Sequence, residues 1–178
     1  MRYNKEYKRY ENILYYGGKM LVNNDIIRRV RYALDIKDNV MIKIFKEGGY
    51  EVTREDVLNI LKKSEDEGFL KCNNQMLEAF LDGLIVVKRG RKEEAPGTTH
   101  EPVKMTKNNI NNIIMRKLRI ALSFRSEDML HVLKLAGVEI SPSELSAIFR
   151  KEDHKNYREC GDRYLRNFLK GLVIYYRG

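Results

Sequence analysis

The sequence predicts an all-α protein built from two copies of one four-helix unit, packed with pseudo-twofold symmetry. Residues 23–90 align without a gap with residues 111–178, at a constant offset of 88 positions. About 20 of the roughly 70 paired positions are identical. Each copy also contains four segments whose apolar residues recur at helical spacing. A self-match of this length is typical of a duplicated unit, and two copies of one unit commonly pack around a twofold axis.

The first helix of each copy is predicted over residues 23–34 and the equivalent stretch of the second copy. Asn23 or Asn24 is a suitable N-cap residue, because its side-chain oxygen can accept a hydrogen bond from a free backbone N–H. The apolar positions recur every three or four residues, as in a helix with one buried face. In the first copy they are Ile26, Ile27, Val30, Ala33 and Leu34.

The second and third helices are predicted from their end signals. The second covers residues 38–47 and ends at Gly48, because glycine is common where a helix stops. The third has its clearest start in the second copy, where Ser141 would be the N-cap and Pro142 the first helical residue. Glu144 follows at the position from which its carboxylate can bind back to the N-cap, which completes a capping box.

The fourth segment is the most apolar part of each copy, over residues 76–85 and 164–173. Its last residues are β-branched and aromatic enough to form a strand instead. The positions before them show no alternation of apolar and polar residues, so a helix is favoured.

Two glycines lie inside this fourth helix at equivalent positions, Gly83 and Gly171. A glycine within a helix costs about 1 kcal/mol relative to alanine, so its presence in both copies indicates a close approach of another backbone. We predict that the two fourth helices cross each other here, with Phe80 and Phe168 in the same repeat interface. Each copy has about 70 residues, a size at which a separate core is marginal, so the copies should bury each other's surface.

The duplication also sets the domain boundaries. The parts are an extension (1–19), the first helical repeat (20–90), a linker (91–107) and the second helical repeat (108–178). The linker contains prolines, glycine and mixed charge, as expected for an exposed connector. The extension ends just before Met20 in a Gly-Gly-Lys sequence, which resembles a translated ribosome-binding site. Met20 is therefore hypothesised to be the true start, which N-terminal mass spectrometry of the native protein would test; an amphipathic N-terminal helix is the alternative.

Composition restricts the class of protein. The formal net charge is +9, and it is uneven, because residues 20–90 are neutral while residues 108–178 carry +5. No apolar run approaches the length of about 20 residues that a membrane span needs. Cys72 and Cys160 occupy equivalent positions and are expected to be reduced, which favours a cytoplasmic location without a membrane; a disulfide between them is the less favoured alternative.

The sequence offers little for catalysis. His100, His131 and His154 do not recur between the copies, which excludes a symmetric histidine site. No phosphate-binding glycine loop and no metal-ligand spacing is present. We therefore expect no catalytic residue, no metal and no cofactor, and do not expect an enzyme.

Positive charge recurs on the first helix of each copy. Two such helical faces in a fixed relation could hold two phosphates or two strands of nucleic acid. The alternative is that the same cations pair with the protein's own carboxylates, such as Glu51 and Glu139, which also recur. The candidate polyanion-binding residues are Arg28, Arg29, Arg31, Arg116, Lys117 and Arg119.

Several short motifs of the first copy resemble those of a known family. They are Asn24-Asp25-Ile26, Arg28, Arg31-Tyr32-Ala33-Leu34, Glu51-Val52-Thr53, Phe80-Leu81-Asp82-Gly83-Leu84-Ile85 and Lys88-Arg89-Gly90. They are similar to the YehS-like family, short bacterial cytoplasmic proteins built from two copies of a domain of unknown function. The resemblance covers residues 20–178 and implies a duplicated helical fold, with no established activity. The second copy departs from the motif at Ile120 and Lys170.

Three hypotheses for function remain from the sequence. The first is a non-enzymatic module that binds nucleic acid or another polyanion. The second is an adaptor whose neutral and basic copies contact different proteins, of which an acidic partner would suit the basic copy. The third and least favoured is an enzyme with a polar pocket between the copies.

Overall fold

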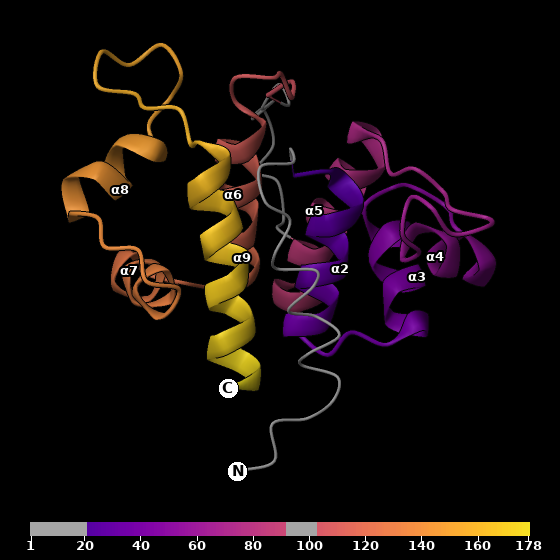
Figure 1. Ribbon diagram of the computed structural model, residues 1–178. Coiled ribbons are helices and arrows are strands. Elements are labelled where there is room, and N and C mark those ends of the chain that lie inside the picture. The colour runs from indigo at the N-terminus through magenta and orange to yellow at the C-terminus, as the bar shows by residue number, and fades with distance from the viewer. Residues whose placement is uncertain (1–20, 92–102) are drawn as a thin grey trace.

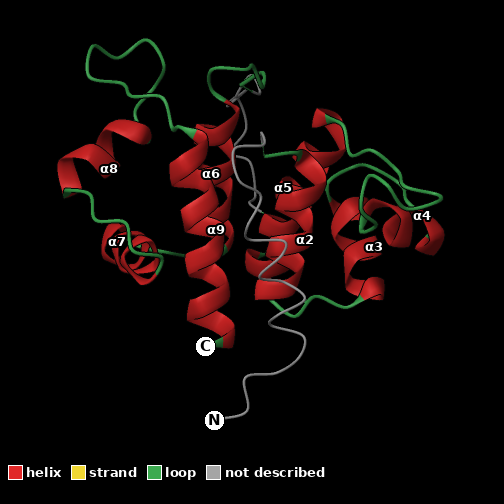
Figure 2. Ribbon diagram, in the orientation of Figure 1, coloured by secondary structure: helices red, strands yellow, loops and turns green. Residues whose placement is uncertain are grey.

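The computed structural model describes residues 21–91 and 103–178. Within these two stretches the secondary structure consists of eight α-helices and no strands, which confirms the predicted all-α class (Figure 2). The proposed leader over residues 1–19 lies outside the described residues, as does linker segment 92–102.

Each repeat contributes four helices in the same order. The first repeat contains α2 (Asn23–Ala33), α3 (Asp38–Glu47), α4 (Arg54–Ile60) and α5 (Asn74–Arg89). The second repeat contains α6 (Ile110–Ala121), α7 (Ser126–Leu135), α8 (Pro142–Ile148) and α9 (Asp162–Arg177). Both α5 and α9 are helical to their last residues, so the strand alternative for the fourth segment is wrong.

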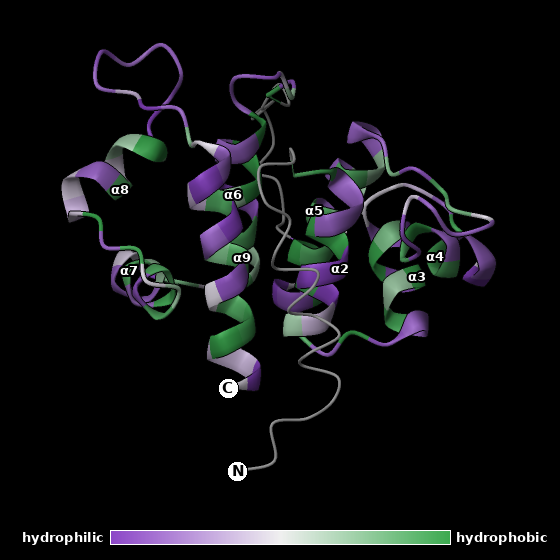
Figure 3. Ribbon diagram, viewed as in Figure 1, coloured by the Kyte–Doolittle hydropathy of each residue, from purple (hydrophilic) through white to green (hydrophobic). Residues whose placement is uncertain are grey.

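The first and fourth helices of both repeats form the centre of the molecule, and the second and third helices lie on its two outer sides (Figure 1). The first helix of each repeat packs on the fourth helix of the other repeat, α2 on α9 and α6 on α5. Exchanging the repeats exchanges these two contacts, as a pseudo-twofold axis requires. One continuous apolar core extends through both repeats, and α9 shows the alternation of green and purple turns typical of an amphipathic helix (Figure 3).

The four central helices all run in the same direction. At their starts, the Asn23 amide donates a hydrogen bond to the Asn74 side chain over 2.9 Å and joins α2 to α5. The Asn111 amide donates the equivalent hydrogen bond to the Asp162 carboxylate and joins α6 to α9. At their ends, the Arg89 guanidinium donates to the Ile120 carbonyl over 3.3 Å, and Arg177 of α9 stacks over a ring of α2. Since parallel helices align their dipoles, cations at this end are stabilised by four carbonyl termini.

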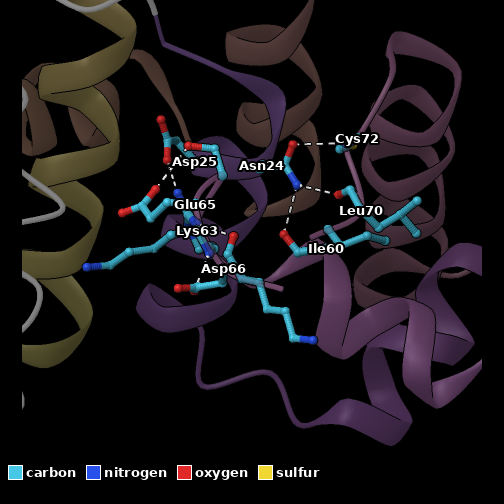
Figure 4. A network of polar contacts seen from close by, with 11 residues as sticks. Asn24, Asp25, Ile60, Lys63, Glu65, Asp66, Leu70 and Cys72 are labelled. Carbon is cyan, nitrogen blue, oxygen red and sulfur yellow. Dashed lines mark hydrogen bonds and ion pairs between the residues drawn. The ribbon is translucent and has the colours of Figure 1, made fainter. Parts of the chain in front are cut away.

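The buried amide of Asn24 organises the first repeat. Asn24 is not the N-cap that the sequence suggested, since α2 begins after Val22 without a side-chain cap. Its Nδ2 donates to the carbonyls of Ile60 and Leu70 over 2.8 and 2.9 Å. Its Oδ1 accepts from the Cys72 backbone N–H over 2.9 Å (Figure 4). The amide therefore fastens both ends of the irregular α4–α5 loop to α2.

The second repeat contains the same arrangement of hydrogen bonds around a buried asparagine. Asn112 donates to the carbonyls of Ile148 and Arg158, each over 2.8 Å, and accepts from the Cys160 N–H over 2.9 Å. Asn112 and its counterpart are both 2% exposed. Since a loop without regular structure must still satisfy its buried backbone groups, one side chain supplies the partners that a helix would otherwise supply.

The third helices start as the sequence predicted. Ser141 accepts from the Glu144 backbone N–H over 3.2 Å, and the Glu144 carboxylate accepts from the Ser141 N–H over 2.8 Å. Thr53 and Asp56 form the equivalent reciprocal pair in the first repeat. The capping boxes are therefore confirmed, because they depend only on residues three positions apart.

The glycines of the fourth helices lie at close crossings, but not at the predicted one. A Cβ at Gly83 would lie 1.7 Å from the Ile44 carbonyl oxygen of α3. A Cβ at Gly171 would lie 2.0 Å from the Val132 carbonyl oxygen of α7. Each glycine thus allows the second helix of its own repeat to pack closely, and the prediction that α5 and α9 cross there is wrong.

The phenylalanines of the fourth helices also serve the core of their own repeat. The Phe80 ring lies 5.6 Å from the Phe45 ring of α3, measured between centroids. Phe168 occupies the equivalent position on α9 and is fully buried. The predicted mutual burial of the repeats is realised instead where α2 meets α9 and α6 meets α5.

Replacing Gly83 or Gly171 by alanine should lower the free energy of unfolding by about 3 kcal/mol or more, because the new methyl group overlaps backbone atoms. The gain in helix propensity, about 1 kcal/mol, is too small to offset this. The two glycines contact different helices, so the losses should add in the double variant. Denaturant unfolding measures all three. Gly161→Ala is the control, because its Cβ would meet no atom within 4 Å and should cost below about 1 kcal/mol.

Replacing Asn24 or Asn112 by alanine should cost at least about 3 kcal/mol in each case. Two buried carbonyls and one buried N–H lose their partner, and each unsatisfied group costs about 1–3 kcal/mol. Asn23→Ala removes one exposed hydrogen bond between side chains and should cost about 1 kcal/mol or less. Urea unfolding and hydrogen exchange at the Cys72 amide measure the effect. Equal costs for Asn24→Ala and Asn23→Ala would contradict the role of the buried amide.

Candidate functional site

Two of the recurrent arginines hold the ends of the third helices. Arg28 forms an ion pair with Asp25 and donates to the Lys62 carbonyl over 2.6 Å, just after α4. Arg116 donates to the Phe149 carbonyl over 3.0 Å, just after α8. Both side chains are therefore bonded to backbone oxygens that a short helix leaves without intrahelical partners.

Two further recurrent arginines close the turn after the first helix. Arg31 donates through Nε to the Ile36 carbonyl over 3.0 Å and through Nη2 to Asp38 over 2.6 Å. Arg119 repeats the first contact, from Nε to the Phe124 carbonyl over 3.2 Å. The geometry supports the internal alternative for these cations.

The internal partners differ from those that the sequence suggested. Glu139 pairs with Lys134 over 3.4 Å rather than with an arginine of the first helix. The arginines bind mainly carbonyl oxygens, which every residue has and which sequence comparison cannot identify. The geometry gives no support to polyanion binding through Arg28, Arg31, Arg116 and Arg119.

The remaining recurrent pair, Arg29 and Lys117, lies at the two contacts between the repeats. Lys117 of α6 pairs across the contact with Asp82 of α5 over 2.6 Å and with Glu78 over 3.5 Å. One cation therefore meets two carboxylates where α6 packs on α5. We name Glu78, Asp82 and Lys117 the compensated crossing, because its one cation is paired with carboxylates.

The equivalent contact of α2 with α9 has the opposite character. Arg29 is only 5% exposed, and the positions that correspond to Glu78 and Asp82 hold Arg166 and Lys170. Burial lowers the pKa of the Arg29 guanidinium; Asp25 acts to raise that pKa and the charge of Arg166 to lower it. We name Arg29, Arg166 and Lys170 the cationic crossing.

The charge of the cationic crossing extends along α9. Arg163 and Arg177 are exposed and, with Arg166 and Lys170, recur at a spacing that places them on one side of the helix. Arg177 lies 3.6 Å from the Asp35 carboxylate and 4.8 Å from the centroid of the Tyr32 ring at the end of α2. Partly buried cations close together repel one another, and an oxyanion placed among them would relieve that repulsion.

The cysteines and histidines are the remaining candidates for chemistry. Both thiols are free and buried, and burial raises the pKa of each to about 12, so the disulfide alternative is wrong. His131 and His154 are exposed on α7 and in the α8–α9 loop, while His100 lies outside the described residues. In the part of the chain that the structure describes, no group of three or more histidines, cysteines or carboxylates could hold a metal. None of the described helices could cross a membrane.

The sequence contained a signal for the cationic crossing in the mismatches between the repeats. Lys170 stands where Asp82 stands in the first copy, and Arg166 stands where Glu78 does. Residues that recur indicate what the two copies share, whereas the informative positions here are those that differ. Their meaning depends on which helices meet, and that was wrongly predicted.

Comparisons with known proteins agree with the duplication. A family described as protein of unknown function (DUF1456) matches twice, over residues 23–90 and 111–178. The chain is 43% identical over 153 residues to a protein of Escherichia coli (strain K12) described as uncharacterized protein YehS. That match spans 86% of this chain and 95% of the relative. No solved structure matches the chain.

Replacing Arg28 or Arg116 by alanine should destabilise the protein by about 1–3 kcal/mol, because each guanidinium satisfies a carbonyl at a helix end. Thermal melts measure the loss. Arg54→Ala is the control, since that side chain is 76% exposed and lies 3.8 Å from Asp38, so its removal should change little. A melt of Arg116→Ala that coincides with that of Arg54→Ala would contradict the structural role.

Proposed function

The chain belongs to the family of proteins of unknown function (DUF1456), and we propose that it is a non-enzymatic module that binds phosphate groups of nucleic acid or another polyanion at the cationic crossing. The observation that carries this proposal is the difference in charge between two equivalent contacts. Where α6 meets α5, one cation faces two carboxylates. Where α2 meets α9, the same three positions are all cationic.

The duplication supplies an internal control for what the fold requires. The compensated crossing shows that carboxylates at positions 78 and 82 suit the packing of a first helix on a fourth helix. Positions 166 and 170 could hold carboxylates in the same geometry. In addition to the effect of burial, Arg166 repels the Arg29 guanidinium and acts to lower its pKa, while Asp25 acts in the opposite direction. A phosphate group would turn that repulsion into attraction, because charge-assisted hydrogen bonds from guanidinium and ammonium groups are strong.

Support also comes from the arrangement of exposed charge. Arg163 and Arg177 continue the cationic crossing along α9 and are open to solvent. Residues 108–178 carry a net charge of +5, while residues 20–90 are neutral. A basic stripe beside a partly buried cluster suits a ligand with several phosphates, of which one is held more tightly than the others.

The reactive side chains favour a binding module over an enzyme. Thiols with a pKa of about 12 stay protonated at neutral pH and are weak nucleophiles. Of the described histidines, His131 contacts the Tyr175 ring and His154 accepts from the backbone of its own loop. Neither is placed next to a described nucleophile in a way that supports acid–base catalysis.

The test replaces two residues of the second repeat by their counterparts in the first repeat. The double variant Arg166→Glu/Lys170→Asp places the residues of the compensated crossing beside Arg29. Binding of a fluorescein-labelled oligonucleotide, followed by anisotropy at several salt concentrations, should weaken by about tenfold or more. The slope of log K against log salt should fall by about 1 to 2, as expected when one or two phosphate contacts are lost.

The control variant is Lys151→Glu/Lys155→Asp in the exposed α8–α9 loop, which removes the same net charge away from the crossing. It should retain most of the affinity. Circular dichroism melts establish that both variants are folded, and Lys170→Gln replaces the double variant if that one is not. Equal losses in the two double variants would mean that only net charge matters, and the proposed site would be refuted.

A further inference from the structure

A group of aromatic side chains lies where α9 ends. The Phe124 ring is stacked on the Tyr176 ring, with centroids 6.5 Å apart and planes 8° apart. Tyr175 meets Phe124 edge-on over 5.7 Å and His131 of α7 over 6.1 Å. We name Phe124, His131, Tyr175 and Tyr176 the aromatic end.

The aromatic end is open to solvent and belongs to the second repeat alone. Tyr175 is 44% exposed and Tyr176 is 42% exposed. The four equivalent positions of the first repeat hold no aromatic residue; they are Ile36, Lys43, Val87 and Lys88. Since the first repeat forms the same helices without these rings, the fold does not require them. Exposed rings gathered in one place indicate a binding surface.

Two arginines are chain neighbours of the aromatic end. Arg125 follows Phe124 directly, and Arg177 follows Tyr176. Arg89 of the first repeat reaches the same end of the molecule, where it donates to the Ile120 carbonyl at the close of α6. Among carboxylates, Asp128 lies near enough to help raise the pKa of Tyr176, after burial and Tyr175. That carboxylate also accepts from the Arg125 backbone N–H over 2.6 Å, which fixes it at the start of α7.

We infer that the aromatic end binds single-stranded nucleic acid, whose bases stack on Tyr175 and Tyr176 while its phosphates contact Arg89, Arg125 and Arg177. Exposed tyrosines beside cations are the combination that holds single strands without regard to sequence. A duplex exposes few base faces on which such rings could stack, because its bases are already stacked and paired. This inference rests on the proposed function and adds the class of nucleic acid.

The aromatic end and the cationic crossing are joined by α9 itself. Tyr176 follows Arg166 by ten residues, a rise of about 15 Å along the helix. The tyrosines lie on a different side of α9 from Arg166 and Lys170, because ten residues do not complete a whole number of turns. A bound strand would therefore pass around the end of α9, where Arg177 contacts both Asp35 and the Tyr32 ring of α2.

The experiment uses the full chain, a fluorescein-labelled oligothymidylate and a duplex of the same length. Wild type should bind the single strand more tightly than the duplex. Tyr175→Ser/Tyr176→Ser should weaken single-strand binding by about tenfold or more, as loss of stacking predicts. The salt slope should stay unchanged, because no phosphate contact is removed. Tyr175→Phe/Tyr176→Phe keeps the rings and should restore the affinity, which excludes a loss caused by unfolding.

Intrinsic fluorescence gives a second readout. The chain has no tryptophan, so its emission comes from its 11 tyrosines, and stacking of bases should quench it in wild type more than in the serine variant. A serine variant that binds as tightly as wild type would overturn the inference, and so would tighter binding of the duplex. A third outcome is that wild type binds linear polyphosphate but no oligothymidylate, and that Arg166→Glu/Lys170→Asp abolishes the polyphosphate binding. This outcome would overturn the inference and leave the proposed function standing. If wild type bound neither probe, the proposed function itself would fail.

Discussion

The fold depends on one buried amide in each repeat. Asn24 and Asn112 each satisfy two carbonyls and one N–H of a loop that has no regular structure. That loop leads from the short third helix to the long fourth helix, so its path decides where α5 and α9 lie. The placement of the fourth helices in turn decides which surface meets the other repeat, and the charges at both crossings follow from it. A polar side chain with every partner satisfied can specify one arrangement where apolar contacts alone would allow several.

Sequence reasoning succeeded where the determining residues are neighbours in the chain. The capping boxes at Thr53 and Ser141 and the ends of the helices depend on residues a few positions apart. The crossing predicted at Gly83 was wrong, because a glycine within a helix indicates the close approach of another backbone but does not identify which one. Helical spacing identifies an apolar face, whereas the partner of that face is decided by the whole chain. Asn24 was misread for the same reason, because an amide near a helix start suits a cap as well as a buried anchor.

The recurrent arginines show how a shared pattern can be real and still mislead. Their recurrence was read correctly as a sign of a shared role, but the partners are carbonyl oxygens at helix ends. Such partners are invisible in a sequence. The parallel direction of the central helices adds a reason for cations at their ends, since four carbonyl termini point the same way. By contrast, the differences at positions 166 and 170 gain meaning only beside Glu78, Asp82 and Lys117, once the two crossings are known to be equivalent.

The reciprocal packing of the repeats has a consequence for divergence. Two separate copies of one repeat, paired about a true twofold axis, would carry identical residues at both crossings, and any substitution would appear twice. Joining the copies in one polypeptide removes that constraint. One crossing can then keep its complementary charges and secure the assembly, while the other is released to change. The two crossings have diverged in this way: Lys117 faces carboxylates at one, and Arg29 has cationic neighbours at the other.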